Sequence, residues 1–162
     1  MVKHGDSSEF STVSLQHESV QNTCITIQCD DTGHSGHNTV DHTAQNLPGI
    51  IKRRLLDKVE RQGVVNPEVI SDILKSSISS FDGEITQGLL DLFPGGAEAI
   101  QKMSDEEIQA IVVVDGRPHP KLVPAMSGTT ALVALVDPGR NLYVASLGDC
   151  QSGKDQLVTP CA

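Results

Sequence analysis

The sequence predicts an α+β fold, and three observations support this prediction. Residues 23–29, "TCITIQC", alternate β-branched with polar side chains, as a short strand does. Between residues 48 and 111 the apolar residues recur at helical spacing. The segments 128–137 and 141–149 are rich in β-branched and apolar residues and are joined by a Pro-Gly-Arg turn. Strand, helices and antiparallel hairpin in this order, without an internal repeat, are typical of a layered α+β domain.

The chain of 162 residues has the length of one domain and can bury a core. We expect a mobile tail, or at best an edge strand, over residues 1–22, where apolar periodicity is weak. The main domain is expected over 23–151 and an irregular tail over 152–162. The core is expected to be aliphatic, because the aromatic residues are few: Phe10, Phe81, Phe93 and Tyr143.

Composition argues against several classes of partner. The net charge is -9 and the longest basic run is 52–54, so strong binding to nucleic acid or to an anionic membrane is not expected. No apolar stretch approaches the ~20 residues of a membrane span, and the first residues do not resemble a signal peptide. Without a secretory signal, we expect an intracellular protein, cytoplasmic or nuclear, with reduced thiols. The cysteines are Cys24, Cys29, Cys150 and Cys161.

The first helical region is expected to consist of two helices. Asn38 or Thr39 can cap a short helix, "TVDHTAQNL", which is expected to stop before Pro48. Pro48 suits the first turn of a second helix, because its missing N–H is not needed there. Gly63 is the expected stop of this second helix.

A longer helix is expected to follow Asn66, which can cap it, and to extend to about Phe93. Ser104 and Glu107 have the spacing of a capping box and predict a third, shorter helix over 104–111. Residues 111–126 contain three prolines and are expected to be irregular.

The C-terminal hairpin is expected to be a central part of the sheet. Its first strand, 128–137, carries apolar residues on both faces, which predicts burial on both sides. After the second strand the pattern changes to the polar residues 151–162 instead of a third strand. We therefore expect a chain that is cut short and a hairpin edge available for self-association.

Residues 29–42, "CDDTGHSGHNTVDH", are the densest group of reactive side chains, and three interpretations are open. A structural zinc would use thiolates and imidazoles, although Cys24 and Cys29 would lie on opposite faces of one strand. A nucleophilic Ser35 beside His34 lacks the Gly-x-Ser-x-Gly pattern of hydrolases. The residues that a zinc site would draw on are Cys24, Cys29, His34, His37 and His42.

The third interpretation is a divalent metal held by oxygen atoms. Asp31 ends the predicted strand, and Gly33 can turn the backbone and offer a carbonyl. His34 could act as an acid beside the metal, and Asp149 follows the second hairpin strand. Mn²⁺ and Mg²⁺ take carboxylates, carbonyls and water from several segments, so these residues suit either ion.

Several stretches resemble the metal-dependent protein phosphatases (PPM, or type 2C). Residues 127–151, "SGTTALVALVDPGRNLYVASLGDCQ", resemble that family's Ser-Gly-Thr-Thr-Ala strand and the Gly-Asp-Ser strand that follows. Residues 32–48, "TGHSGHNTVDHTAQNLP", resemble its Asp-Gly-His-Gly-Gly loop and the next helix. "SFDGEI" and "LFPGG" resemble its helical region. The resemblance extends over residues 23–151.

This resemblance implies a β-sandwich flanked by helices, of which the chain holds roughly the N-terminal half. It implies two Mn²⁺ or Mg²⁺ ions that activate a water to hydrolyse phosphoserine and phosphothreonine in proteins. Gly33 would offer its carbonyl to a metal, His34 would be the general acid, and Asp149 would be a metal carboxylate. The bridging aspartate would be Asp31, except that Thr32 stands at its position.

The departures from the family pattern predict weak or absent activity. A slip of one residue puts Asp31 on the opposite face of the strand unless a bulge absorbs Thr32. No arginine occurs before Arg53, and the family's last two metal aspartates would lie beyond Ala162. The alternative is a non-catalytic, pseudophosphatase-type module that binds phosphoproteins or a partner protein.

Overall fold

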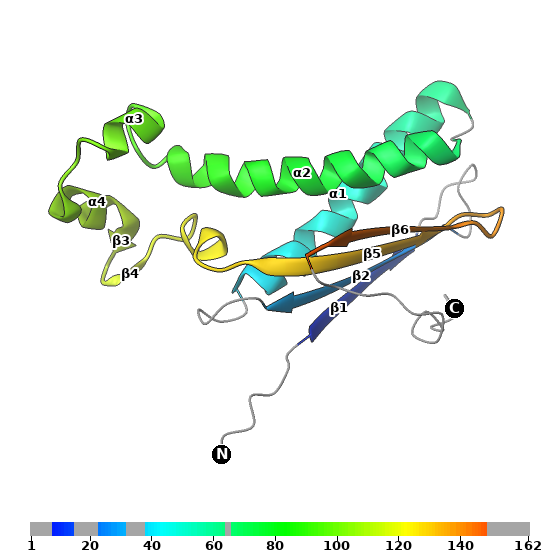
Figure 1. Cartoon of the computed structure of the whole chain (residues 1–162), viewed down its shortest axis with the longest axis horizontal. Coiled ribbons are helices and arrows are strands. Elements are labelled where there is room, and N and C mark those ends of the chain that lie inside the picture. The colour runs from blue at the N-terminus through cyan, green and yellow to red at the C-terminus, as the bar shows by residue number, and fades with distance from the viewer. Residues whose placement is uncertain (1–7, 15–22, 32–37, 64–65, 149–162) are drawn as a thin grey trace, which may run out of the picture.

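The computed structural model describes residues 8–14, 23–31, 38–63 and 66–148, and these form one four-stranded antiparallel sheet with helices on one face (Figure 1). The strands are β1 (Ser8–Ser14), β2 (Cys24–Asp31), β5 (Thr129–Val136) and β6 (Leu142–Leu147), in the order β1-β2-β5-β6. The long helices are α1 (Asn38–Gln62) and α2 (Pro67–Leu90). The predicted α+β class is confirmed.

Strand β1 lies within the segment that the sequence predicts to be a tail. Its residues pair antiparallel with β2, from Ser8 opposite Asp30 to Ser14 opposite Cys24. The expectation of a mobile tail is therefore wrong for 8–14, and the alternative of an edge strand is confirmed there. The weak apolar pattern of 8–14 hides a strand because pairing with β2 supplies the backbone hydrogen bonds that define it.

Alternate residues of the central strands form the core under the helices. Ile25, Ile27, Val133 and Leu135 are 0 to 1% exposed and belong to this core. The intervening residues of β5 belong to the far face, and they too are buried between Thr130 and Leu135. The prediction that this strand is buried on both sides is confirmed.

Helix α1 corrects the expectation of two helices divided at Pro48. It runs without a break from Asn38 to Gln62, with Pro48 inside it and fully buried. An internal proline removes one helical hydrogen bond and costs about 3 kcal/mol. Here the turns on both sides of Pro48 bury Leu47 and Ile51 against the sheet, which outweighs that cost.

Helix α2 begins as the sequence predicts. The Asn66 side chain accepts a hydrogen bond of 2.9 Å from the Val69 N–H. The helix ends at Leu90, three residues before the expected end. It packs along α1 through buried residues that recur at helical spacing: Ile70, Ile73, Leu74, Ser77 and Phe81.

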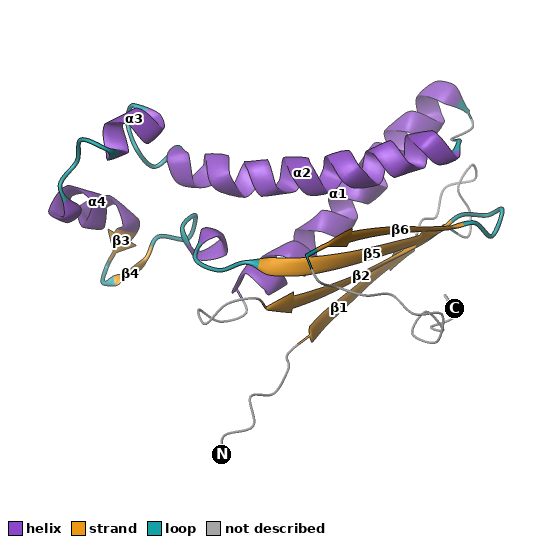
Figure 2. Ribbon diagram, in the orientation of Figure 1, coloured by secondary structure: helices purple, strands orange, loops and turns teal. Residues whose placement is uncertain are grey.

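The segment between α2 and β5 lies beyond one end of the sheet (Figure 2). It contains α3 (Gly96–Ile100), α4 (Asp105–Val112), the β3 (Val113–Val114) and β4 (Arg117–Pro118) ribbon, and a 3-10 turn, η2 (Val123–Ala125). The capping box at the start of α4 is confirmed. The Glu107 side chain accepts a hydrogen bond of 2.8 Å from the Ser104 N–H, and the Ser104 hydroxyl accepts one of 3.3 Å from the Glu107 N–H. Residues 111–126 are thus not wholly irregular.

The hairpin turn at 138–140 is held by one carboxylate. Asp137 accepts hydrogen bonds from the Asn141 backbone at 2.8 Å, the Asn141 side chain at 2.8 Å and the Tyr143 hydroxyl at 3.2 Å. Burial opposes ionisation of Asp137, but these hydrogen bonds outweigh it and lower the pKa of the carboxyl below its ordinary value. The predicted turn is confirmed. Among the described helices, none is long and apolar enough to cross a membrane.

Candidate functional site

The sheet register brings two of the predicted motifs to the same end of the sheet. Asp31, the last residue of β2, pairs with Thr129, the first residue of β5. On the other side of β5, Leu147 of β6 pairs with Ala131, and Gly148 follows it. The chain therefore leaves β2 and β6 at the same end, on either side of the start of β5.

Gly148 can only be a glycine in this arrangement. Its φ is +81°, in the left-handed region that L side chains rarely adopt. A Cβ at this position would lie 2.8 Å from Cγ2 of Thr130 and 3.3 Å from its Cβ. The close approach of β6 to β5 thus explains the glycine that precedes Asp149.

A buried hydroxyl ties the start of α1 to the Ser-Gly-Thr-Thr segment. Thr39 is 4% exposed, and its Oγ1 lies 2.8 Å from the Pro124 carbonyl oxygen and 3.0 Å from that of Ser127. The same Oγ1 lies 2.8 Å from Oγ of Ser127. Since Thr39 can donate to a carbonyl and accept from Ser127, it fixes 124–127 against the helix that follows the predicted loop.

Thr39→Val is expected to lower the free energy of unfolding by about 1–3 kcal/mol, because it leaves the part-buried carbonyl oxygens of Pro124 and Ser127 without this donor at nearly unchanged volume. The matched control is Thr43→Val, one helical turn later. Thr43 is 3% exposed, and its hydroxyl has no hydrogen-bond partner among the residues that the structure describes. In urea denaturation, Thr43→Val should leave the free energy of unfolding unchanged or raise it. Equal losses in both variants would contradict the anchoring role of Thr39.

A cavity of about 260 Å³ lies beneath this anchor, between α1, α2 and the start of β5. Its lining combines hydroxyl groups of Thr39, Thr43 and Ser127 with the ring of Phe81 and the carboxylate of Asp82. None of the described lining residues is basic. A phosphate group needs cationic or N–H donors, so the lining suits a neutral or cationic group better than a phosphate.

Most of the predicted site residues lie outside the described residues. These are Gly33, His34, Ser35, His37 and Asp149. His42, by contrast, lies in α1, where its ring stacks on Phe81 of α2 with centroids 5.4 Å apart. It belongs to the packing of the two helices.

The cysteines correct one expectation. Cys24 is disulfide-bonded, whereas Cys29 is a buried thiol. The expectation of reduced thiols is wrong for Cys24, because spacing in the sequence does not reveal which cysteines folding brings together. A disulfide sulfur is not a thiolate ligand, so Cys24 does not suit the zinc interpretation.

The position of Asp31 bears on the bridging carboxylate. The pairing of β2 with β5 is regular from Cys24 to Asp31, and Thr32, where the bulge would have to lie, is outside the described residues. Ile25, Ile27 and Cys29 are alternate core residues on the helix side of β2. Within the described ranges, no group of three or more His, Cys, Asp and Glu side chains could hold a metal ion.

Comparisons with models of protein families, with curated proteins and with solved structures found no match. The likeness to the PPM phosphatases therefore rests on the motifs themselves. The anchor at Thr39 was not evident from these motifs, since its partners lie 85 to 88 residues further along the chain. A threonine at the start of a helix suggests only a local cap.

Proposed function

We propose that this chain is a divergent phosphatase-type domain of the PPM family that by itself hydrolyses phosphoserine and phosphothreonine weakly or not at all. The fold that goes with this proposal is the helix-flanked β-sandwich of that family. The observation that carries the proposal is the shared end of the sheet, where the loop after Asp31 and the residue after Gly148 both begin. In the family pattern these two segments supply metal ligands.

The proposed site has a simple division of roles. Asp31, the Gly33 carbonyl and Asp149 would hold Mn²⁺ or Mg²⁺, and His34 would protonate the leaving oxygen. A bound divalent ion would lower the pKa of its water and neutralise charge on the phosphoryl oxygens. The register around Thr130 supports this division, because Gly148 brings the chain within van der Waals distance of β5 just before Asp149.

Two observations support the weak activity. A bridging carboxylate would need the position held by Thr32, one residue after Asp31, the last residue of β2. The cavity nearest this end of the sheet lacks a basic lining residue among those described. Without a basic side chain beside the proposed metal, the phosphate would be positioned less well.

The proposal is tested by Mn²⁺ titration and by turnover of a small aryl phosphate at high protein concentration. We expect weak Mn²⁺ binding that is lost in Asp149→Ala, and a rate near the uncatalysed background. Asp57→Ala, on the exposed face of α1, is the control and should bind Mn²⁺ normally. Fast turnover abolished by Asp149→Ala would contradict the weak activity. Mn²⁺ binding that is unchanged in Asp149→Ala would contradict the assigned site.

The alternative function is a non-catalytic module that binds a phosphoprotein or another partner. Thr32, which stands where the family pattern has the bridging aspartate, favours this alternative, since its side chain supplies no carboxylate for a dinuclear centre. Pull-downs with matched phosphorylated and unphosphorylated baits separate the two functions. Retention of a phosphorylated bait without Mn²⁺ would favour the binding module over the phosphatase.

A further inference from the structure

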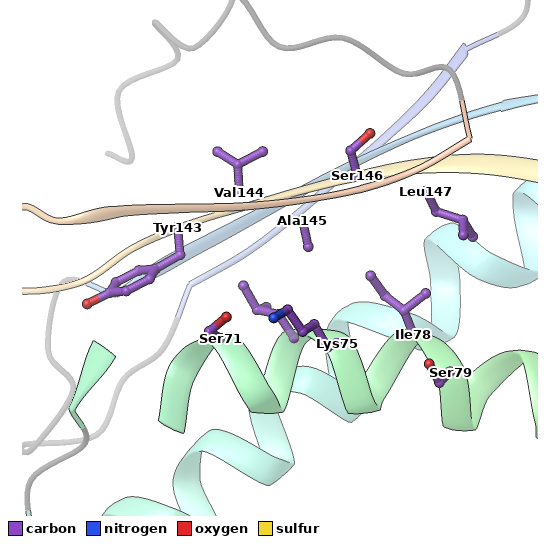
Figure 3. A pocket seen from close by; sticks show the side chains of 10 residues that line it. Ser71, Lys75, Ile78, Ser79, Tyr143, Val144, Ala145, Ser146 and Leu147 are labelled. Atoms are coloured by element: carbon purple, nitrogen blue, oxygen red, sulfur yellow. The ribbon is translucent and has the colours of Figure 1, made fainter. Parts of the chain in front are cut away.

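A second cavity, which shares Ile78 and Leu147 with the first, opens between α2 and the outer strand β6. It has a volume of about 420 Å³. Figure 3 shows Tyr143, Ala145 and Leu147 of β6 pointing toward α2, and Val144 and Ser146 pointing away from it. Leu147 is 44% exposed, although it lies on the helix side of the sheet. The helix and the strand therefore form an incompletely filled apolar groove.

The placement of the helices explains this groove. Helix α1 lies over β1 and β2, whereas α2 contacts β6 and makes few contacts with β5. A helix is about 10 Å wide with its side chains, and neighbouring strands are only about 4.8 Å apart. A helix over the last strand therefore also covers space beyond that strand. No other described strand pairs with the outer edge of β6.

We propose that this groove binds an extended segment of a partner protein, which pairs with the edge of β6 and inserts alternate side chains beneath α2. Strand addition of this kind takes affinity from backbone hydrogen bonds and specificity from pockets for every second side chain. The groove accepts aliphatic side chains over Ala145 and Leu147. The occupant is a single strand of alternating pattern and not a helix.

The charge of the groove defines one further feature of the segment. Lys75 is the charged residue among the described residues that line the groove, in a chain of net charge -9. The remaining polar groups are hydroxyls, such as those of Ser71 and Ser79. A carboxylate on the groove side of the segment, opposite Lys75, would pair with this ammonium group. We therefore expect an apolar strand with one acidic residue.

A second copy of this chain fits the groove less well than a lone segment. Two copies paired through β6, with their helices on the same side, would bring two α2 helices over one seam. Because α2 contacts β6 in each copy, we expect the two helices to compete for the volume over the seam. Leu142 and Val144 are 49 and 42% exposed, so self-association is nevertheless measured in the test.

The test uses a fluorescein-labelled peptide, Thr-Val-Thr-Glu-Thr-Val-Thr-Val, whose second, fourth, sixth and eighth side chains face the groove. Fluorescence polarisation with the full chain should show saturable binding. Lys75→Glu is expected to weaken this binding by about fivefold, because it turns an exposed attraction into repulsion. A peptide with lysine in place of glutamate should recover affinity for Lys75→Glu.

Two neighbouring variants separate the groove from the rest of β6. Ala145→Leu adds volume inside the groove and should reduce binding without lowering the melting temperature. Val144→Leu enlarges a side chain on the opposite face, by one methylene group, and should leave binding unchanged. No binding to the intact chain, or binding insensitive to Lys75→Glu and Ala145→Leu, would overturn the proposal. A dimer in sedimentation that Ala145→Leu disrupts would identify a second copy as the occupant and overturn it too.

Discussion

Leu135→Ala is expected to lower the free energy of unfolding by about 2–5 kcal/mol. Leu135 lies in β5, the strand between β2 and β6, and is 1% exposed. It pairs with Ile25 on one side and with Tyr143 on the other, all on the face covered by the helices. Removing its isobutyl group leaves a cavity. The three paired strands around this cavity cannot move together to fill it.

The control for this prediction is the next residue of the strand. Val136 lies on the opposite face and is 38% exposed, so Val136→Ala should cost about 1 kcal/mol or less. Urea denaturation followed by far-UV circular dichroism measures both variants. Similar losses for Leu135→Ala and Val136→Ala would contradict the assignment of the two faces.

Gly148→Ala is expected to destabilise the chain by about 2–4 kcal/mol, from backbone strain together with a forced contact. The φ of +81° strains any L side chain, and the new methyl group would lie 2.8 Å from Cγ2 of Thr130. Both penalties act at the junction that carries Asp149. The variant should therefore loosen this end of the sheet before the helices unfold, and amide hydrogen exchange at Thr129 and Thr130 measures this loosening.

The control for Gly148→Ala is the same substitution in a helix. Gly83 lies in α2, and a Cβ there would meet nothing within 4 Å. Gly83→Ala should stabilise the chain by about 0.5–1 kcal/mol, because alanine favours the helix and restricts the unfolded chain. If Gly148→Ala were as stable as Gly83→Ala, the close approach of β6 to β5 would be wrong.

The glycine at 148 also changes how the phosphatase resemblance is weighed. Its conformation and its contact with Thr130 suffice to explain the residue without any catalytic requirement. A Gly-Asp pair can therefore persist in a domain that has lost its activity. Mn²⁺ titration of Asp149→Ala therefore distinguishes the phosphatase from the binding module more sharply than the presence of the Gly-Asp motif does.

Local interactions are what the sequence by itself determined. The Asn66 cap and the Ser104–Glu107 capping box join residues three apart, so both can be recognised in a short stretch of sequence. The hairpin turn at 138–140 is local for the same reason. The burial of β5 on both faces was also predicted, because a run of apolar residues without alternation has no solvent side.

The tertiary structure decided the features that depend on distant partners. Pro48 remains inside α1 because the sheet buries the helix on both sides of it. Residues 8–14 become a strand because β2 offers them an edge. Thr39 anchors 124–127 across more than eighty residues. Each outcome is set by burial or pairing between segments far apart in the sequence. Local helix and strand propensities do not include the free energies of these contacts.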